Sequence, residues 1–188
     1  YNFEYYLENF LDIFKIWQGG MSFHGGVIGI ILSSIIFSRK NDHNVFKYLD
    51  IIAIVSPIGI FFGRLANFIN SELYGHETSL PWGVQFIKID NLYRHPSQIY
   101  EAILEGLVLF LLLIFLHRKN EFNKPGILSS LFLVLYSIFR FVGEYFRVPD
   151  EHIGYLFLKL TMGQLMSIVF FIIGLLLYYF IICVKKES

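Results

Sequence analysis

Long apolar stretches separated by short charged connections form the dominant pattern along this chain of 188 residues. A helix needs about 20 predominantly apolar residues to cross the hydrocarbon core of a bilayer. Five stretches approach that length, at approximately residues 21–38, 48–62, 98–116, 126–146 and 161–184. The second is the shortest and contains Pro57. The pattern therefore predicts an all-α fold, a polytopic transmembrane helical bundle with about five spans.

The first residues of the chain do not have the pattern of a span. Aromatic, acidic and apolar positions alternate along YNFEYYLENFLDIFKIWQGG. We interpret residues 1–20 as an interfacial outer segment. Residues 21–188 are predicted to form a single transmembrane domain with an outer loop at residues 64–97. Because the chain starts with Tyr1 rather than Met and has no signal-peptide pattern, we expect an N-terminal part to be missing.

Alternate connections and the C-terminus carry lysine and arginine without matching acids. These basic residues are Arg39, Lys40 and Lys47; Arg118, Lys119 and Lys124; and Lys185 and Lys186. The positive-inside rule places such connections in the cytoplasm. The sequence therefore predicts a cytoplasmic C-terminus and places residues 1–20, 64–97 and 147–160 on the outer side of the membrane.

The composition supports a membrane protein and excludes several function classes. Charged residues make up 16% of the chain and hydrophobic residues 55%, whereas soluble domains carry about 25% charged residues. With a formal net charge of zero and no basic tract, nucleic acid is not an expected partner, because its phosphates require clustered Lys and Arg. Cys183 is the single cysteine and the histidines are dispersed. The sequence therefore predicts no disulfide framework, no metal site and no other cofactor.

Unusual polar side chains gather at the outer ends of the predicted spans. Tyr136, Arg140 and Glu144 recur at i, i+4 and i+8, which places them on one helical face. A second face follows the spacing i, i+3 and i+7, and two other spans contribute further polar groups. These are Gln98, Glu101 and Glu105 on the second face; His24 on the first span; and Arg64, Asn67 and Asn70 after the second span. Four helices thus direct polar side chains to one level of the membrane.

This polar layer has two interpretations. An arginine at the centre of a span costs about 2.5 to 3.5 kcal/mol, so Arg64 and Arg140 require an anion. Glu101 and Glu144 can supply it, in which case the layer is an ion-pair network that only holds helices together. Alternatively, the planar bidentate donors of the two arginines bind a phospholipid phosphate.

The remaining polar residues carry the same ambiguity. His24 is either a histidine that is hydrogen-bonded at a helix end, or a general base or phosphate partner, since imidazole titrates near neutral pH. Asn67 and Asn70 either satisfy backbone groups where a helix ends or contact a substrate.

Five strings of the sequence carry a resemblance to a known family. They are GGMSFHGGVIG (residues 19–29), GRLANFINSELYG (63–75), RHPSQIYEAILEG (94–106), YSIFRFVGEYFRVPD (136–150) and LTMGQL (160–165). The strings cover most of the chain in the expected order. On these motifs the chain resembles the prolipoprotein diacylglyceryl transferases.

The resemblance implies an activity, partners and a location. Family members have seven spans with the C-terminus inside, so the two N-terminal spans are expected to be absent here. The implied reaction transfers the diacylglyceryl group of phosphatidylglycerol to the lipobox cysteine thiol of a lipoprotein precursor and releases glycerol phosphate. The implied partners are phosphatidylglycerol, precursor signal peptides with a lipobox cysteine, and membrane lipids. The implied location is the bacterial inner membrane, with the active site towards the outer leaflet.

The resemblance also assigns site residues. Family positions fall on His24, Arg64, Asn67, Glu72, Gly75, Tyr136, Arg140 and Glu144, each of the same type here. We expect Arg64 and Arg140 to grip the lipid phosphate from two helices. Glu144 and Tyr136 would orient Arg140, and His24 would deprotonate the thiol, with Glu101 as the alternative base. The expected substrate-binding residues are Arg64, Asn67, Asn70, Glu72, Gly75 and Glu101.

The chain departs from the family pattern at four positions. They are Ala66 and Ser71, where family members usually have Gly; Tyr74, where Trp is usual; and His76, where Arg is common. Two other function classes stay open at this point. A transporter or channel with an intramembrane Arg/Glu pathway would spread polar groups across the depth of the membrane. A noncatalytic assembly protein held by ion pairs would tolerate Lys in place of Arg.

Overall fold

The structure, a computed structural model, describes residues 9, 12, 23–119, 124–149, 154–156 and 160–183. The predicted interfacial segment, residues 1–20, lies outside the described residues except for Asn9 and Asp12, and so does the predicted boundary at residue 20. The chain divides into two compact units, residues 1–45 and residues 46–188. Each unit is described by itself.

The first unit contains one apolar helix, α2 (Phe23–Lys40), which corresponds to the first predicted span. The helix ends with Arg39 and Lys40 in its last turn, where positive charge is favoured by the helix dipole. Asp42 follows in the left-handed conformation, with φ of 55°. The amide of His43 donates to the carbonyl of Ser38 at 2.9 Å, which satisfies one of the last helical carbonyl groups.

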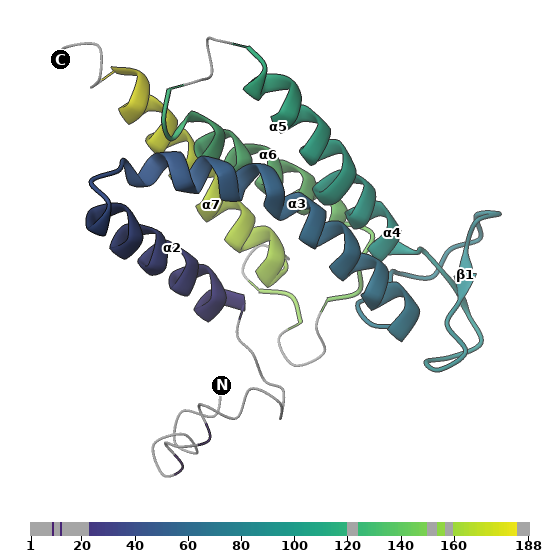
Figure 1. Ribbon diagram of the computed structural model, residues 1–188. Helices are drawn as coiled ribbons and strands as arrows, with labels where there is room; N and C mark the ends of the chain where they lie inside the picture. Colours follow the sequence, from purple (N-terminus) through teal and green to yellow (C-terminus); the bar gives the residue numbers. More distant parts are fainter. Residues whose placement is uncertain are drawn as a thin grey trace. The chain divides into compact units, whose positions relative to one another are not determined.

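The second unit contains the other helices (Figure 1). In chain order they are α3 (Val45–Asn70), α4 (Ser97–Glu101), η3 (Ala102–Val108), α5 (Leu109–His117), α6 (Ile127–Gly143) and α7 (Met162–Cys183). The elements α4, η3 and α5 are continuous, and η3 is a π-helical segment within them. All four of the later predicted spans are therefore helices, as the apolar pattern predicts.

The helices have the length and surface of membrane spans. Within the described ranges, three helical stretches are long and apolar enough to cross a bilayer, namely Val45–Asn70, Ser97–His117 and Met162–Cys183, and the apolar helix α6 is shorter. Large apolar side chains such as Phe62, Phe115 and Leu176 are exposed. Polar side chains, in contrast, are buried between the helices. This inverted distribution fits a protein whose outer surface faces lipid.

Two glycines bring neighbouring helices close together. A Cβ on Gly106 of η3 would lie 2.6 Å from the Cβ of Phe61 on α3. A Cβ on Gly174 of α7 would lie 3.0 Å from the Cβ of Leu133 on α6. Small residues at such crossings allow the close backbone approach that stabilises helix pairs in lipid.

The second predicted span differs from the structure in its length. The apolar pattern ends it at Phe62, but α3 continues to Asn70 and has Pro57 inside it. Arg64 and Asn67 therefore lie on the last turns of a helix, and the non-helical segment begins only at Ser71. A span of 26 residues is longer than the hydrocarbon core requires, so the polar turns can extend into the interfacial region.

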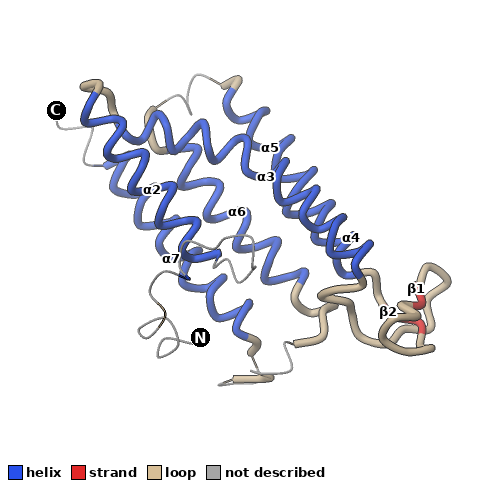
Figure 2. The backbone as a smooth tube through the Cα atoms, turned by 60° about the horizontal axis from the view of Figure 1, so that its bottom comes forward, coloured by secondary structure: helices blue, strands red, loops and turns tan. Residues whose placement is uncertain are grey.

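The segment between α3 and α4 is folded on itself. Strands β1 (Val84–Gln85) and β2 (Tyr93–Arg94) pair antiparallel, with Val84 opposite Arg94. Figure 2 shows this ribbon beyond the N-terminal end of α4. The guanidinium of Arg94 lies 2.6 Å from the carboxylate of Asp90 and 5.0 Å from the ring centroid of Tyr74. One arginine thus ties the ribbon to the chain that leaves α3.

The contact between Asp90 and Arg94 makes the order of the ribbon depend on pH. The Arg94 guanidinium hydrogen-bonded to Asp90 lowers the pKa of that carboxyl. Because the pKa of Asp90 is lower in the folded protein, the contribution of this contact to stability is complete above the unfolded pKa of about 3.9. It is lost as the pH falls through the folded pKa. We expect the hydrogen-exchange protection of the Leu92 amide, which donates to Asp90 Oδ1 at 3.0 Å, to fall once the pH drops below about 4.

The Asp90→Asn variant tests this expectation. Its neutral side chain keeps an oxygen that can accept from the Leu92 amide but does not titrate, so protection at Leu92 should show no transition below about pH 4. A matched control, Lys88→Gln, changes an exposed charge on the same segment and should keep the wild-type transition. Protection that stays constant in the wild-type protein down to pH 2 would contradict the assignment.

Candidate active site

Two glutamates near the N-terminal end of the continuous helix form the centre of the site. Glu101 is the last residue of α4 and Glu105 lies in η3. Both are fully buried, at 0% exposure. Residues four apart share a helical face, so both carboxylates lie on the same side of this helix. A π-helical segment inside an α-helix is frequently found at a functional position.

Arginines from two other helices converge on these carboxylates. Arg64 of α3 places Nη1 3.0 Å from Glu101 Oε2 and Nη2 3.0 Å from Glu105 Oε2. Arg140 of α6 donates from Nη1 to Glu101 Oε1 and lies 3.6 Å from Glu105 Oε1. Its Nη2 lies 2.6 Å from Glu144 Oε2. We call these five residues the arginine–glutamate cluster.

The start of α7 supports Glu144. Thr161 Oγ1 donates to Glu144 Oε1 at 2.9 Å. Thr161 also forms a capping box with Gln164, in which the Gln164 amide donates to Thr161 Oγ1 at 3.2 Å and the Thr161 amide donates to Gln164 Oε1 at 3.1 Å. A Cβ on Gly163 would lie 2.6 Å from Glu144 Oε1. The glycine therefore leaves room for the carboxylate against the first turn of α7.

The cluster has the chemistry of an anion-binding site. The side chains of Arg64 and Arg140 keep 14% and 12% exposure, whereas Glu101 and Glu105 have none. The two arginine side chains are therefore mostly buried but not completely enclosed. Each carries five N–H donors, and only some of them face the glutamates. The surroundings are largely dry, so remaining donors would bind a phosphate oxygen more strongly than they would in water.

The predicted substrate-binding residues outside the cluster have structural partners. Asn67 Nδ2 donates to Glu72 Oε2 at 2.9 Å. Gln98 Nε2 donates to the carbonyl of Glu72 at 2.5 Å, while its buried Oε1 has no hydrogen-bond partner among the residues that the structure describes. Asn70 ends α3 and is exposed. Gly75 lies between the backbones of His95 and Phe146.

Tyr136 lies close enough to the cluster to interact electrostatically with both arginines, whereas the side chain of His24 is not among the described ones. Tyr136 stacks on Phe132 with ring centroids 5.7 Å apart, and its hydroxyl forms no hydrogen bond with the described residues. His24 lies in the first turn of α2, its side chain is outside what the structure describes, and its helix belongs to the other unit. No group of three or more His, Cys, Asp and Glu side chains in the described ranges could hold a metal ion.

A comparison with protein families decides the identity of this chain. The model of the family described as prolipoprotein diacylglyceryl transferase matches residues 1–180. The chain belongs to this family. The resemblance inferred from the motifs is thereby confirmed.

Curated relatives of the chain are named after the activity of this family. A phosphatidylglycerol–prolipoprotein diacylglyceryl transferase of Rickettsia bellii is 49% identical over 178 residues, which cover 94% of this chain and 68% of the relative. Proteins with that name from Wolbachia sp. subsp. Drosophila simulans and Rhodospirillum rubrum are 49% and 47% identical, and in each case 66% of the relative is covered. The chain thus spans about two thirds of the length of these transferases. A transporter or channel, the alternative considered above, has no support among these relatives.

Several residues of this prolipoprotein diacylglyceryl transferase chain have roles that sequence reasoning missed. Glu105 was placed on a polar face but was given no site role, although it contacts both arginines. The spacing of Thr161 and Gln164, the T-x-x-Q signature of a capping box, could have indicated that a helix begins beside Glu144. Nothing in the sequence indicated how closely Gly163 approaches that carboxylate.

The departures from the family pattern lie in the segment between α3 and α4 or at the end of α3. Ser71 adopts φ of 63°, a left-handed conformation that favours glycine. Tyr74 supplies the ring beneath Arg94. The amide of His76 donates to Phe146 at 2.9 Å, and its carbonyl accepts from the His95 amide at 2.9 Å. Ala66 is exposed on α3.

Proposed function

We propose that this chain catalyses the transfer of the diacylglyceryl group from phosphatidylglycerol to the lipobox cysteine thiol of lipoprotein precursors. Its membership of the prolipoprotein diacylglyceryl transferase family is the observation that carries the proposal. In the reaction the cysteine sulfur forms a bond to a glyceryl carbon. The bond between that carbon and the phosphate oxygen breaks, the oxygen keeps the electron pair, and glycerol phosphate leaves.

Arg64 and Arg140 are the proposed clamp for the leaving phosphate. They approach from two helices and meet at one pair of carboxylates, which supports a site where one anion contacts both guanidinium groups. Negative charge on the leaving phosphate grows in the transition state. Preorganised donors placed there stabilise the transition state more than the bound lipid.

Glu144 is the proposed orienting residue for Arg140, since its carboxylate lies 2.6 Å from Nη2 and is itself held by Thr161. Tyr136, one turn earlier on the same helix, is proposed to share that role. Asn67, Asn70, Glu72 and Gly75 are proposed to form the outer rim where lipid and precursor bind.

His24 is the proposed base that takes the thiol proton, because the thiolate is the reactive nucleophile. Glu101 is the weaker candidate, since both guanidinium groups engage its carboxylate.

The chain is a membrane protein, and its orientation completes the proposal. We place the arginine–glutamate cluster towards the outer leaflet and the C-terminus in the cytoplasm. The basic residues Arg118, Lys119 and Lys124 follow α5 at the end opposite to Glu101, and such clusters favour the cytoplasmic side.

Reconstitution tests the activity directly. The protein would be placed in vesicles with phosphatidylglycerol and a peptide that contains a lipobox cysteine, and mass spectrometry would detect the thioether product. We expect product formation only when both substrates are present. A peptide in which serine replaces the lipobox cysteine should give none. Absence of product from correctly inserted, natural-length protein would overturn the proposal.

The pH dependence of turnover tests the base. Wild-type turnover should rise across the range in which imidazole loses its proton, about pH 6 to 7. We expect His24→Gln to lower turnover about 10²- to 10⁴-fold and to remove this rise. The His43→Gln variant, a histidine in the turn after α2, is the matched control and should keep the wild-type profile. An unchanged profile at an undiminished rate in His24→Gln would remove this residue from the chemistry.

A further inference from the structure

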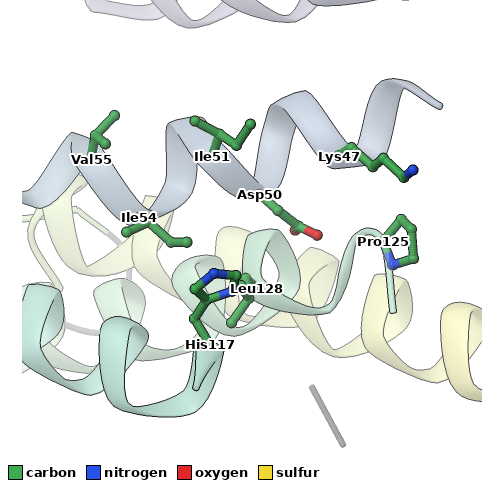
Figure 3. Close-up of a pocket in the computed structure, with 8 residues that line it drawn as sticks. All are labelled: Lys47, Asp50, Ile51, Ile54, Val55, His117, Pro125 and Leu128. Atoms are coloured by element: carbon green, nitrogen blue, oxygen red, sulfur yellow. The ribbon is translucent and has the colours of Figure 1, made fainter. Parts of the chain in front are cut away.

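A second polar site lies at the opposite end of the bundle. A cavity of about 300 Å³ opens between the beginning of α3, the end of α5 and the beginning of α6 (Figure 3). Its size is at the lower end of the range for small-molecule sites in proteins, about 300 to 1,000 Å³. The cavity belongs entirely to the second unit of the chain.

The lining combines apolar walls with a polar rim. Ile51, Ile54 and Leu128 provide apolar surface, while Lys47 and His117 provide an ammonium group and a ring N–H donor. Figure 3 shows the Lys47 side chain at one end of the cavity and the His117 ring beneath Ile54. The side chains of Lys47 and His117 have no hydrogen bond or ion pair with any residue in the described ranges. An apolar wall beside free donors fits a molecule with an anionic head and an apolar chain.

Asp50, the acidic residue in the cavity, has its carboxylate turned towards the start of α6 and forms no ion pair with Lys47 in the part of the chain that the structure describes. Both carboxylate oxygens of Asp50 are engaged by the start of α6. The amide of Gly126 donates to Oδ2 at 2.7 Å, and the amide and hydroxyl of Ser129 donate to Oδ1 at 2.7 and 2.6 Å. The aspartate therefore caps the helix and compensates its dipole, while Lys47 remains available to another anion.

The position of the cavity separates it from the arginine–glutamate cluster. Lys47 and Arg64 are 17 residues apart on one helix, which corresponds to about 26 Å along its axis. Glu101 and His117 are 16 residues apart, or about 24 Å. These spacings approach the thickness of a hydrocarbon core, about 30 Å. If the cluster faces the outer leaflet, the cavity faces the inner one.

We infer that this cavity binds the headgroup of an anionic phospholipid from the inner leaflet. The phosphate would contact Lys47 and His117, and an acyl chain would lie along Ile51 and Val55, which are 58% and 50% exposed. Basic pockets between transmembrane helices on the cytoplasmic side are suited to such headgroups. A lipid held there would bridge α3 to α5 and α6. The inference does not depend on the transfer reaction.

Quenching of tryptophan fluorescence by brominated lipids tests the inference. The natural-length protein would carry Ile51→Trp in the apolar wall of the cavity. Phenylalanine would replace all native tryptophans, Trp17 and Trp82 among them. It would be reconstituted in phosphatidylcholine with increasing fractions of brominated phosphatidylserine, and then with brominated phosphatidylcholine as the reference. Each cationic contact is worth roughly fivefold in lipid binding, so we expect at least about fivefold selectivity for phosphatidylserine.

The rim residues and a matched control distinguish a site from general attraction to the surface. The variant Lys47→Gln with His117→Gln should bring the selectivity to about one. Lys119→Gln removes a cation at the same end of the bundle, where the ammonium lies 4.6 Å from the Phe115 ring centroid and outside the cavity lining, and it should keep the selectivity. If the double variant does not fold, Lys47→Gln alone should reduce the selectivity roughly fivefold. The inference would be overturned if quenching in the Ile51→Trp protein did not depend on the headgroup. Equal losses of selectivity in Lys47→Gln and Lys119→Gln would also overturn it.

Discussion

Replacing Arg140 with lysine is expected to lower turnover about 100- to 1,000-fold, the usual cost of losing one donor to the charge that develops in a transition state. Lysine keeps the positive charge but loses the planar fork that serves two partners. Arg140 now contacts Glu101, Glu105 and Glu144 at once, and a single ammonium group could not hold that arrangement while it binds a phosphate. Turnover with phosphatidylglycerol and a lipobox peptide is the measurement.

Lysine is the informative replacement because it limits the damage to the fold. Removing the charge altogether would take from buried Glu144 the arginine that it contacts, which costs about 3 to 5 kcal/mol, so a loss of activity in Arg140→Gln could reflect unfolding. Arg118→Lys, at the end of α5 far from the cluster, is the matched control and should keep full activity. If Arg140→Lys inserted normally and kept turnover within twofold, the phosphate clamp would be the wrong assignment, and the cluster would only hold helices together.

The helices were predictable because the bilayer imposes a simple rule on sequence. Runs of about 20 apolar residues must be helical in lipid, and the predicted span at residues 98–116 corresponds closely to the helical stretch Ser97–His117. The rule failed at the outer end of α3. Arg64 interrupts the apolar run, although burial against two glutamates lets the helix continue through it. Hydropathy along one segment contains no information about the partner that compensates a charge.

The candidate site was predictable from the sequence to a similar extent. Spacing on α6 places Arg140 and Glu144 on one face, and Glu101 and Glu144, the anions considered for the arginines, both contact Arg140. Pairing across helices was harder, because Glu105 reaches both arginines only in the assembled bundle. The roles assigned to Tyr136 and His24 stay predictions.

Gly75 shows where a motif and a structure give different reasons for the same residue. The motif places it among the substrate-binding residues. In the structure its amide donates to the His95 carbonyl at 3.1 Å. The neighbouring His76 amide donates to the Phe146 carbonyl at 2.9 Å. A Cβ on Gly75 would lie 2.6 Å from the Phe146 oxygen and closer still to the His95 oxygen.

Gly75→Ala is therefore expected to lower the free energy of unfolding by about 3 kcal/mol, the upper part of the range for overpacking, because both obstacles are backbone atoms that are themselves hydrogen-bonded. For a chain of this size that loss corresponds to a fall in Tm of roughly 6 to 12 °C, measurable by thermal unfolding in detergent. Gly59→Ala is the matched control, since a Cβ there meets nothing within 4 Å and alanine favours the helix by up to about 1 kcal/mol. A raised KM in Gly75→Ala at an unchanged Tm would instead favour direct substrate binding, because a residue that only contacts the substrate contributes nothing to the stability of the free protein.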